Sequence, residues 1–246
     1  FRSEYEGREV ALKVLRDTDR ASMRKRFLRE GRLLQRLDHP GLVRCLAAFD
    51  GDSPALVLDL LVGLPLDERL ARQPLDGDEA MHLAGTVLRV LQYLHDHGIV
   101  HRDVKASNIY CASDNRIVLM DLGLAADPID PITTTLGDVL GTYAYMAPEQ
   151  IAGADSDHRC DLYSLGVTLY EAVCGTRPYA ARGAAGWLAA HRSGAATPLV
   201  EVASGIPVRL AGLVDRLMAR DPAARPATAA VALAMLTGTA GMRRDL

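Results

Sequence analysis

Three polar side chains near the middle of the chain have the types and spacing that phosphoryl transfer requires. Asp103 is a carboxylate, Lys105 supplies an ammonium group two residues later, and Asn108 supplies a carboxamide three residues beyond it. A carboxylate can take a proton from a hydroxyl group, and an ammonium group can neutralise charge on phosphate. A carboxamide oxygen is a suitable ligand for a hard metal ion. The sequence therefore predicts a catalytic loop at these residues.

A predicted β-hairpin follows this loop and supplies a second metal ligand. Residues 109–111 and 117–120 are typical of two short strands joined by a turn rich in Asp and Asn, and Asp121 follows the second strand. Because a hairpin returns the chain to its starting point, we expect Asp121 to lie beside Asp103 and Asn108. One proton acceptor, one cation and two oxygen ligands suit phosphoryl transfer with Mg²⁺. Turn formation and capping are the alternative roles for each Asp and Asn taken singly.

Two further elements must position this loop from the first part of the chain. Residues 8–15 alternate as a strand that carries Lys13, and residues 22–37 have the period of a helix, with Glu30 on its apolar stripe. A core-facing carboxylate requires a partner, because breaking a buried ion pair costs about 3–5 kcal/mol. A surface pair with an arginine such as Arg26, worth about 0.3–0.5 kcal/mol, is the alternative for Glu30. The alternative for Lys13 is an edge-strand lysine that opposes aggregation.

Four motifs in the chain resemble those of the eukaryotic-type Ser/Thr protein kinases that also occur in bacteria. The motifs are Val10-Ala11-Leu12-Lys13, His101-Arg102-Asp103 with Lys105 and Asn108, Asp121-Leu122-Gly123, and Ala147-Pro148-Glu149. The resemblance covers nearly the whole chain and implies an α+β fold with two lobes. It implies a small, mostly antiparallel sheet with one helix at residues 1–58, a hinge at 59–63, a larger helical lobe at 64–238 and a tail at 239–246.

The resemblance also implies a role for each residue of the predicted site. Glu30 would pair with Lys13, whose ammonium group would meet the α- and β-phosphates of ATP. Asp103 would accept the proton of the substrate hydroxyl, and Lys105 would balance charge on the transferred phosphoryl group. Mg²⁺ would be held by Asn108 and Asp121. The remaining nucleotide-binding positions would be Ala11, Leu58, the backbone of Asp59 and Leu61, and Tyr110.

The segment from Asp121 to Glu149 resembles the activation segment of these kinases. Its three consecutive threonines are candidate phosphorylation sites, and a phosphothreonine could pair with Arg102. These threonines are Thr133, Thr134 and Thr135. Thr142 would lie at the start of the part that seats the substrate and would form a hydrogen bond toward the catalytic loop. A solvated loop is the alternative, and self-association for autophosphorylation is a further expectation.

Supporting residues are expected behind the catalytic loop. Asp161 begins a helix that is apolar on nearly all sides, so its carboxylate would be buried and would need donors. The resemblance supplies these donors as backbone N–H groups around His101 and Arg102, and it pairs Arg225 with Glu149. The alternative for Arg225 is an exposed cation at a helix start. In the predicted helix at 76–97, His95 and His97 are expected to face solvent or to cap the helix.

Composition sets the broad class of the protein. The chain has 246 residues, 49% of them hydrophobic, and a formal net charge of −3, which suits a globular protein and indicates no nucleic-acid surface. The four cysteines share no short spacing, so we expect no disulfide framework or zinc site, and a reducing, cytoplasmic setting. The longest apolar run, residues 55–66, is too short to cross a bilayer, so we expect no membrane segment in this piece.

These observations predict transfer of the γ-phosphoryl group of Mg-ATP to a Ser or Thr hydroxyl on a protein substrate. The Gly-rich phosphate loop of such kinases is expected before Phe1, so we interpret the sequence as a fragment. Binding of ATP without this loop is the alternative to a fragment. The alternative is a pseudokinase that serves as a scaffold or a nucleotide-sensing module. The absent loop and Leu122, which replaces the commoner Phe, favour that alternative. The retention of Lys13, Asp103, Asn108 and Asp121 opposes it. A small-molecule phosphotransferase is disfavoured by the predicted peptide-seating segment, residues 141–149.

Overall fold

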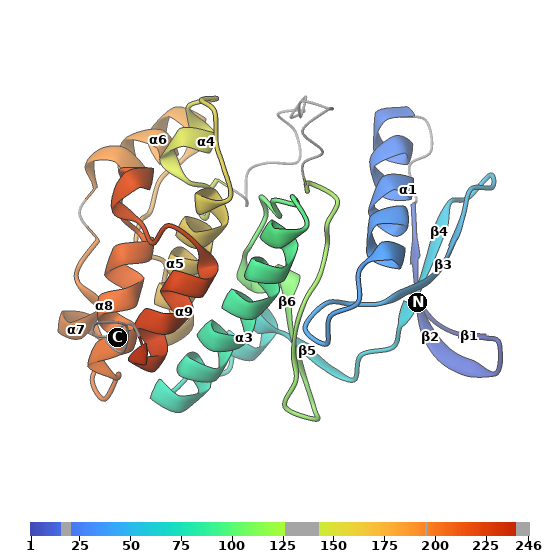
Figure 1. Cartoon of the computed structure of the whole chain (residues 1–246), viewed down its shortest axis with the longest axis horizontal. Helices are drawn as coiled ribbons and strands as arrows, with labels where there is room; N and C mark the ends of the chain where they lie inside the picture. The colour runs from blue at the N-terminus through green and yellow to red at the C-terminus, as the bar shows by residue number, and fades with distance from the viewer. Residues whose placement is uncertain (16–20, 126–142, 195, 240–246) are drawn as a thin grey trace, which may run out of the picture.

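A computed structural model describes residues 1–15, 21–125, 143–194 and 196–239. Figure 1 shows two lobes side by side, with strands and one helix on the right and most of the helices on the left. A second, smaller sheet lies between them. The two-lobed α+β architecture expected from the sequence is confirmed.

The first lobe is a four-stranded antiparallel sheet with one helix packed against it. The strands have the order β1-β2-β4-β3 and comprise β1 (Arg2–Tyr5), β2 (Arg8–Val14), β3 (Cys45–Phe49) and β4 (Ala55–Asp59). Helix α1 (Ala21–Arg36) turns Phe27, Leu34 and Glu30 inward. It approaches the sheet so closely at Gly31 that an added Cβ would overlap the side chain of Leu56 on β4. The absence of a side chain at this position allows the helix to lie directly on the sheet.

The smaller sheet positions the catalytic loop. It has the antiparallel order β5-β6-β7, with β5 (Gly63–Pro65), β6 (Ile109–Ala112) and β7 (Ile117–Leu119), and a 3₁₀ turn η1 (Ala106–Asn108) leads into β6. The β6–β7 hairpin is the one predicted from the sequence. Its turn places Asn115 in the left-handed region at φ 66°, which Asn tolerates better than most residues.

The second lobe is built around one buried helix. The described helices are α2 (Leu66–Leu70), α3 (Gly77–Asp96), α4 (Pro148–Ile151), α5 (Arg159–Cys174), α6 (Gly183–Ser193), α7 (Leu199–Val202), α8 (Val208–Leu217) and α9 (Ala229–Thr237), with a 3₁₀ turn η2 (Pro222–Ala224). Nearly every residue of α5 is buried, as apolar residues on nearly all sides of the helix predict. A capping box begins α3, because Asp76 and Glu79 each accept the other's backbone N–H, at 2.9 and 3.0 Å. Gly175 ends α5 in the left-handed conformation.

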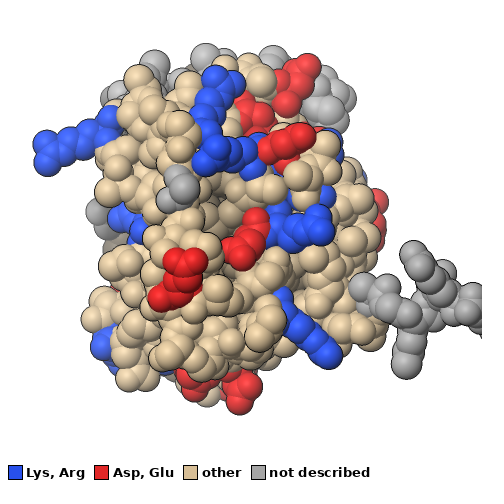
Figure 2. Space-filling model, turned by 90° about the vertical axis from the view of Figure 1, so that its left-hand side faces the viewer, with Lys and Arg blue, Asp and Glu red and all other residues tan. Residues whose placement is uncertain are grey.

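The outer end of the second lobe carries charges of both signs. Figure 2 shows this face, on which acidic and basic side chains lie near one another among large uncharged areas. No single sign of charge dominates the described part of this face. Among the described helices, none has the length and apolar character that a membrane span needs. The cytoplasmic setting remains a prediction.

Candidate active site

The catalytic loop brings three polar side chains into direct contact. Asp103 Oδ2 accepts hydrogen bonds from Lys105 Nζ at 2.8 Å and from Asn108 Nδ2 at 2.9 Å. Asn108 Nδ2 also donates to the backbone oxygen of Asp103 at 2.8 Å, so the amide oxygen Oδ1 of Asn108 points away from this carboxylate. Asp103 Oδ1 is buried and bonds to no described residue. An unpaired buried carboxylate oxygen requires an explanation, and a hydroxyl donor from a ligand would provide one.

The hairpin closes on this loop through His101. The His101 Nε2 lies 3.1 Å from the backbone oxygen of Met120, and its Nδ1 lies 3.2 Å from the backbone nitrogen of Asp103. Since a carbonyl only accepts, Nε2 carries the proton and Nδ1 accepts from the Asp103 N–H. The Met120 N–H also donates to the Asn108 backbone oxygen at 2.8 Å. These bonds hold the start of the loop against the end of β7, so Asp121 follows directly beside it.

Lys13 joins the first lobe to the hairpin. Its Nζ lies 2.7 and 2.8 Å from the two carboxylate oxygens of Glu30 and 3.5 Å from Asp121 Oδ1. Burial opposes the charge on Lys13, but the carboxylates of Asp121 and Glu30 outweigh it, so the pKa of Lys13 is raised. Burial also acts to raise the pKa of Asp121, but Lys13 and the Gly123 N–H outweigh it, and the net pKa is lowered. Both groups are therefore charged at neutral pH.

The predicted nucleotide-binding residues lie on β2, on β4 and the chain that follows it, and on β6. Ala11 on β2 lies directly opposite Leu58 on the neighbouring strand β4. The Asp59 N–H donates to the Arg44 backbone oxygen at 3.0 Å. Tyr110 donates its hydroxyl to the backbone oxygens of Gly63 and Leu61, at 2.9 and 3.3 Å. Tyr110 thus braces the chain between β4 and β5, and its contact with a nucleotide stays a prediction.

Asp161 supports the catalytic loop from beneath. Its side chain is fully buried, with Oδ2 accepting from the His101 N–H at 2.9 Å and Oδ1 from the Arg102 N–H at 2.7 Å. Burial alone would raise the pKa of Asp161, but the bond from His95 and the charges and N–H groups around it lower the pKa overall. The carboxylate orients the backbone at the residue before Asp103.

The expectation for His95 was wrong. Its side chain is largely buried, and its Nε2 lies 2.9 Å from Asp161 Oδ2. The sequence pattern failed here because the partner is 66 residues away, on a different helix. The one available signal was the burial of Asp161 itself, which implied more donors than the backbone alone supplies.

Glu149 and Arg225 form a second buried support. The Arg225 Nη1 and Nη2 lie 2.6 and 2.9 Å from the two carboxylate oxygens of Glu149, and the Arg225 side chain is fully buried. The other donors reach the backbone oxygens of Ala219, Arg159 and Arg220. All five N–H donors of the guanidinium group are therefore used. Such a pair ties α4, which overlaps the end of the predicted substrate-seating segment, to the loop after α8.

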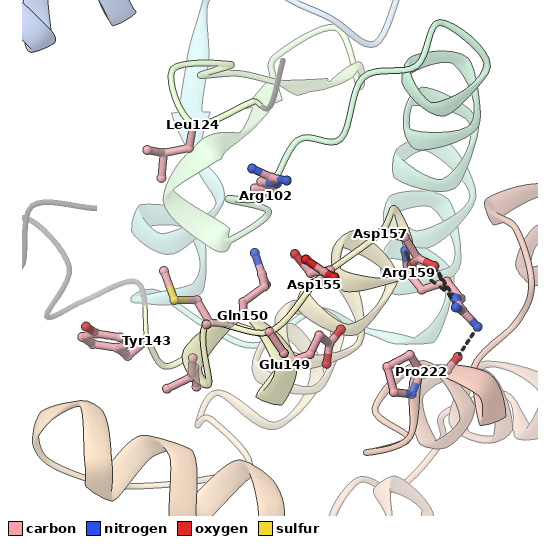
Figure 3. A pocket seen from close by; sticks show the side chains of 14 residues that line it. Arg102, Leu124, Tyr143, Glu149, Gln150, Asp155, Asp157, Arg159 and Pro222 are labelled. Atoms are coloured by element: carbon pink, nitrogen blue, oxygen red, sulfur yellow. Dashed lines mark hydrogen bonds and ion pairs between the residues drawn. The ribbon is translucent and has the colours of Figure 1, made fainter. Parts of the chain in front are cut away.

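A groove of about 720 Å³ lies beside Arg102. Figure 3 shows Arg102 and Leu124 on one side of the groove and Tyr143, Gln150 and Glu149 across from them. Arg102 has a left-handed backbone, at φ 67°, and its Nε is buried with no bond to a described residue.

The four threonines predicted to act in the activation segment lie outside the described residues, namely Thr133, Thr134, Thr135 and Thr142. Phosphorylation there, and self-association that leads to it, stay predictions.

This chain matches a known protein family over nearly all of its length. Residues 2–235 match the protein kinase domain. The chain belongs to the protein kinase family. Kinases of this family generally use ATP and Mg²⁺, and the oxygen donors of Asn108 and Asp121 fit Mg²⁺, which commonly takes few protein ligands and completes its shell with phosphate and water.

Bacterial serine/threonine-protein kinases are similar to this kinase domain over most of its length. It is 36% identical over 235 residues to serine/threonine-protein kinase pkn2 of Myxococcus xanthus, covering 91% of this chain and 28% of that protein. It is 37% identical over 246 residues to the DNA damage-responsive kinase RqkA of Deinococcus radiodurans, covering 98% and 36%. For PknA of Mycobacterium tuberculosis the identity is 35% over 229 residues, covering 89% and 52%. The chain thus spans between about a quarter and a half of these relatives.

Proposed function

We propose that this kinase domain transfers the γ-phosphoryl group of Mg-ATP to Ser or Thr hydroxyls of a protein substrate. The observation that carries the proposal is the buried Oδ1 of Asp103, which has no hydrogen-bond partner among the described residues, beside Oδ2, which accepts from Lys105 and from Asn108. A substrate hydroxyl could donate to Oδ1, and Asp103 would orient the hydroxyl and accept its proton. The similar bacterial proteins are named serine/threonine-protein kinases, which supports the Ser/Thr class of acceptor.

The other side chains would position and neutralise charge rather than react. Lys105 would offset charge on the transferred group, and Asn108 with Asp121 would hold Mg²⁺. Lys13, oriented by Glu30, would bind the α- and β-phosphates. When bound, Mg-ATP supplies the phosphoryl group itself. The adenine would lie against Ala11, Leu58 and Tyr110, with hydrogen bonds to the backbone of Asp59 and Leu61.

The proposed function also assigns a role to each lobe of the chain and to the hinge between them. We assign residues 1–58 to the lobe that covers the nucleotide, 59–63 to the hinge, and 64–238 to the lobe that carries the catalytic loop and the protein substrate, with 239–246 as a tail. The pseudokinase alternative gains no support from the relatives, each of which is named a kinase. A scaffold has no chemical need for the bonded set around Asp103.

The direct test is incorporation of radiolabelled γ-phosphate from ATP into a generic protein substrate, followed by phosphoamino-acid analysis. The proposal predicts Mg²⁺-dependent phosphoserine or phosphothreonine. Nucleotide binding with no transfer to any protein would instead indicate the pseudokinase. Transfer to small-molecule acceptors alone would contradict the choice of substrate class.

A further inference from the structure

His191 is a buried polar residue that the proposed chemistry leaves unused. It lies on α6 and is fully buried. Its ring packs among three aromatic rings, with centroids 5.0 Å from Tyr179, 5.6 Å from Tyr163 and 5.7 Å from Trp187. A polar ring in such a setting must satisfy its two nitrogen atoms locally.

Both nitrogens of His191 have partners, and these determine which nitrogen carries the proton. Nε2 lies 3.0 Å from the backbone oxygen of Tyr143, and Nδ1 lies 2.6 Å from the hydroxyl of Tyr163. Because a carbonyl only accepts, Nε2 must be the N–H donor. Burial lowers the pKa of His191 to about 4, so the ring is neutral at neutral pH and Nδ1 accepts from the Tyr163 hydroxyl. Tyr163 therefore orients the ring that holds Tyr143.

The segment that His191 holds has no helical or strand structure of its own. Residues 143–147 lie between the undescribed part of the activation segment and α4. Side chains of α5 also anchor it, since Ser164 Oγ donates to the Tyr145 backbone oxygen at 2.8 Å. The Tyr145 hydroxyl in turn donates to Glu171 at 2.5 Å. Its course is thus determined by side chains from α5 and α6 rather than by a backbone ladder.

We propose that His191 is a positioning residue for the protein substrate. Its bond to the Tyr143 oxygen, with the Tyr163 hydroxyl behind it, holds residues 143–145 in the shape that seats the peptide next to the phosphoacceptor. This inference rests on the proposed kinase function. It predicts that His191 affects the peptide and not the nucleotide, because the residues that would bind ATP lie on other elements.

Two substitutions of similar polarity separate this role from simple core packing. His191→Gln can place its amide N–H near the former Nε2 and keep the bond to Tyr143. His191→Asn reaches only the former Nδ1 and can keep the Tyr163 contact alone. We expect His191→Asn to raise the KM for a peptide about five- to tenfold, with the KM for ATP unchanged within about twofold. We expect His191→Gln to remain within about twofold of the wild type.

A matched control comes from Thr168, a fully buried residue of α5 whose hydroxyl bonds the Ser164 backbone oxygen at 2.8 Å. Thr168→Val removes a buried hydrogen bond without touching residues 143–147, and we expect it to keep the wild-type peptide KM. Equal KM values for the wild type and His191→Asn would overturn the inference. An equal rise in both His191 variants would also overturn it, because packing alone would then explain the effect.

Hydrogen exchange gives a readout that does not depend on catalysis. We expect the amides of Ala144, Tyr145 and Met146 to exchange faster in His191→Asn than in the wild type and in His191→Gln. If the wild type transferred no phosphate to protein, the proposed function would fail while this measurement still tested the anchor. Unchanged exchange in His191→Asn would overturn the anchor itself.

Discussion

Lys105 Nζ lies 2.8 Å from Asp103 Oδ2, leaving the other carboxylate oxygen of Asp103 buried and unpaired among the described residues. One oxygen is thus held by a cation while the other is available to a hydroxyl donor. This division explains how a single carboxylate can be both fixed in place and ready to accept a proton.

Asp103→Asn should lower phosphate transfer by at least about 100-fold, because an amide cannot accept the proton of the substrate hydroxyl. ATP affinity should be unchanged, since the assigned phosphate and metal ligands remain. Radiolabelled transfer and nucleotide titration measure the two effects. Asp114→Asn, at an exposed pair with Arg116 in the hairpin turn, is the matched control. Wild-type transfer by Asp103→Asn would refute the assigned role.

Lys13→Met should weaken ATP binding at least about tenfold and should also destabilise the fold. Glu30, which is 4% exposed, would lose its cation, and because Lys13 itself is 37% exposed the loss should be smaller than the loss of about 3–5 kcal/mol for a fully buried pair. Urea unfolding and ATP titration measure the two losses. Arg32→Met removes a cation from the exposed face of α1 and should change neither quantity appreciably. Equal ATP affinity in the Lys13 variant and the wild type would contradict the assignment.

Mg²⁺ should be needed for the full stabilisation of the domain by ATP. At a hundredfold excess over the dissociation constant, a ligand that binds only the folded state adds about 2.7 kcal/mol. Thermal unfolding with ATP should shift upward on addition of Mg²⁺ and fall back with EDTA. Asn108→Ala and Asp121→Asn should each remove most of the upward shift in unfolding temperature that Mg²⁺ causes in the presence of ATP. A full Mg²⁺ response in both variants would exclude these two residues as its ligands.

Arg225→Met should destabilise the domain by about 3–5 kcal/mol, because it leaves Glu149 without a partner in a largely buried position. Arg225→Lys should recover little, since an ammonium group cannot supply five donors in one plane. Urea unfolding measures both. Arg116→Met, which breaks an exposed ion pair, should cost under about 1 kcal/mol. Similar losses in the Arg225 and Arg116 variants would show that burial of the pair contributes nothing.

His191 should make the stability of the domain depend on pH. Its folded pKa of about 4 lies below the unfolded value of about 6.5, so the unfolded chain binds the extra proton between these limits. The free energy of unfolding should therefore fall as pH drops from about 6.5 to about 4, by at most about 1.4 kcal/mol per pH unit. Tyr163 and Tyr179, which pack on the ring, have raised pKa values and stay neutral there.

Urea unfolding at pH 7, 6 and 5 tests this contribution. The slope of stability against pH should be shallower in His191→Gln than in the wild type, because glutamine does not titrate. His82→Gln, at an exposed position on α3, is the control and should keep the wild-type slope. Equal slopes in the wild type and His191→Gln would assign the pH dependence to other groups.

The hairpin from Ile109 to Leu119, the capped helix α3 and the buried helix α5 could all be predicted from local patterns. Each depends on alternation, periodicity or a cap within a short stretch of chain, which adjacent residues specify. The order of Asp103, Lys105, Asn108 and Asp121 sufficed to predict phosphoryl-transfer chemistry for the same reason. The first three lie in the loop before one hairpin, and Asp121 lies just after it.

Contacts between distant segments were decided by the tertiary structure. The period of α1 showed that Glu30 faces inward, but only the packing of α1 on the sheet brings it to Lys13. Local pattern likewise placed His95 on α3 without its partner Asp161 on α5, and only the tertiary structure brings His191 of α6 to Tyr143. These partners lie 17 to 66 residues apart along the chain, and their contact depends on how helices and sheets pack. Periodicity within one element carries no information about which distant residue a side chain will contact.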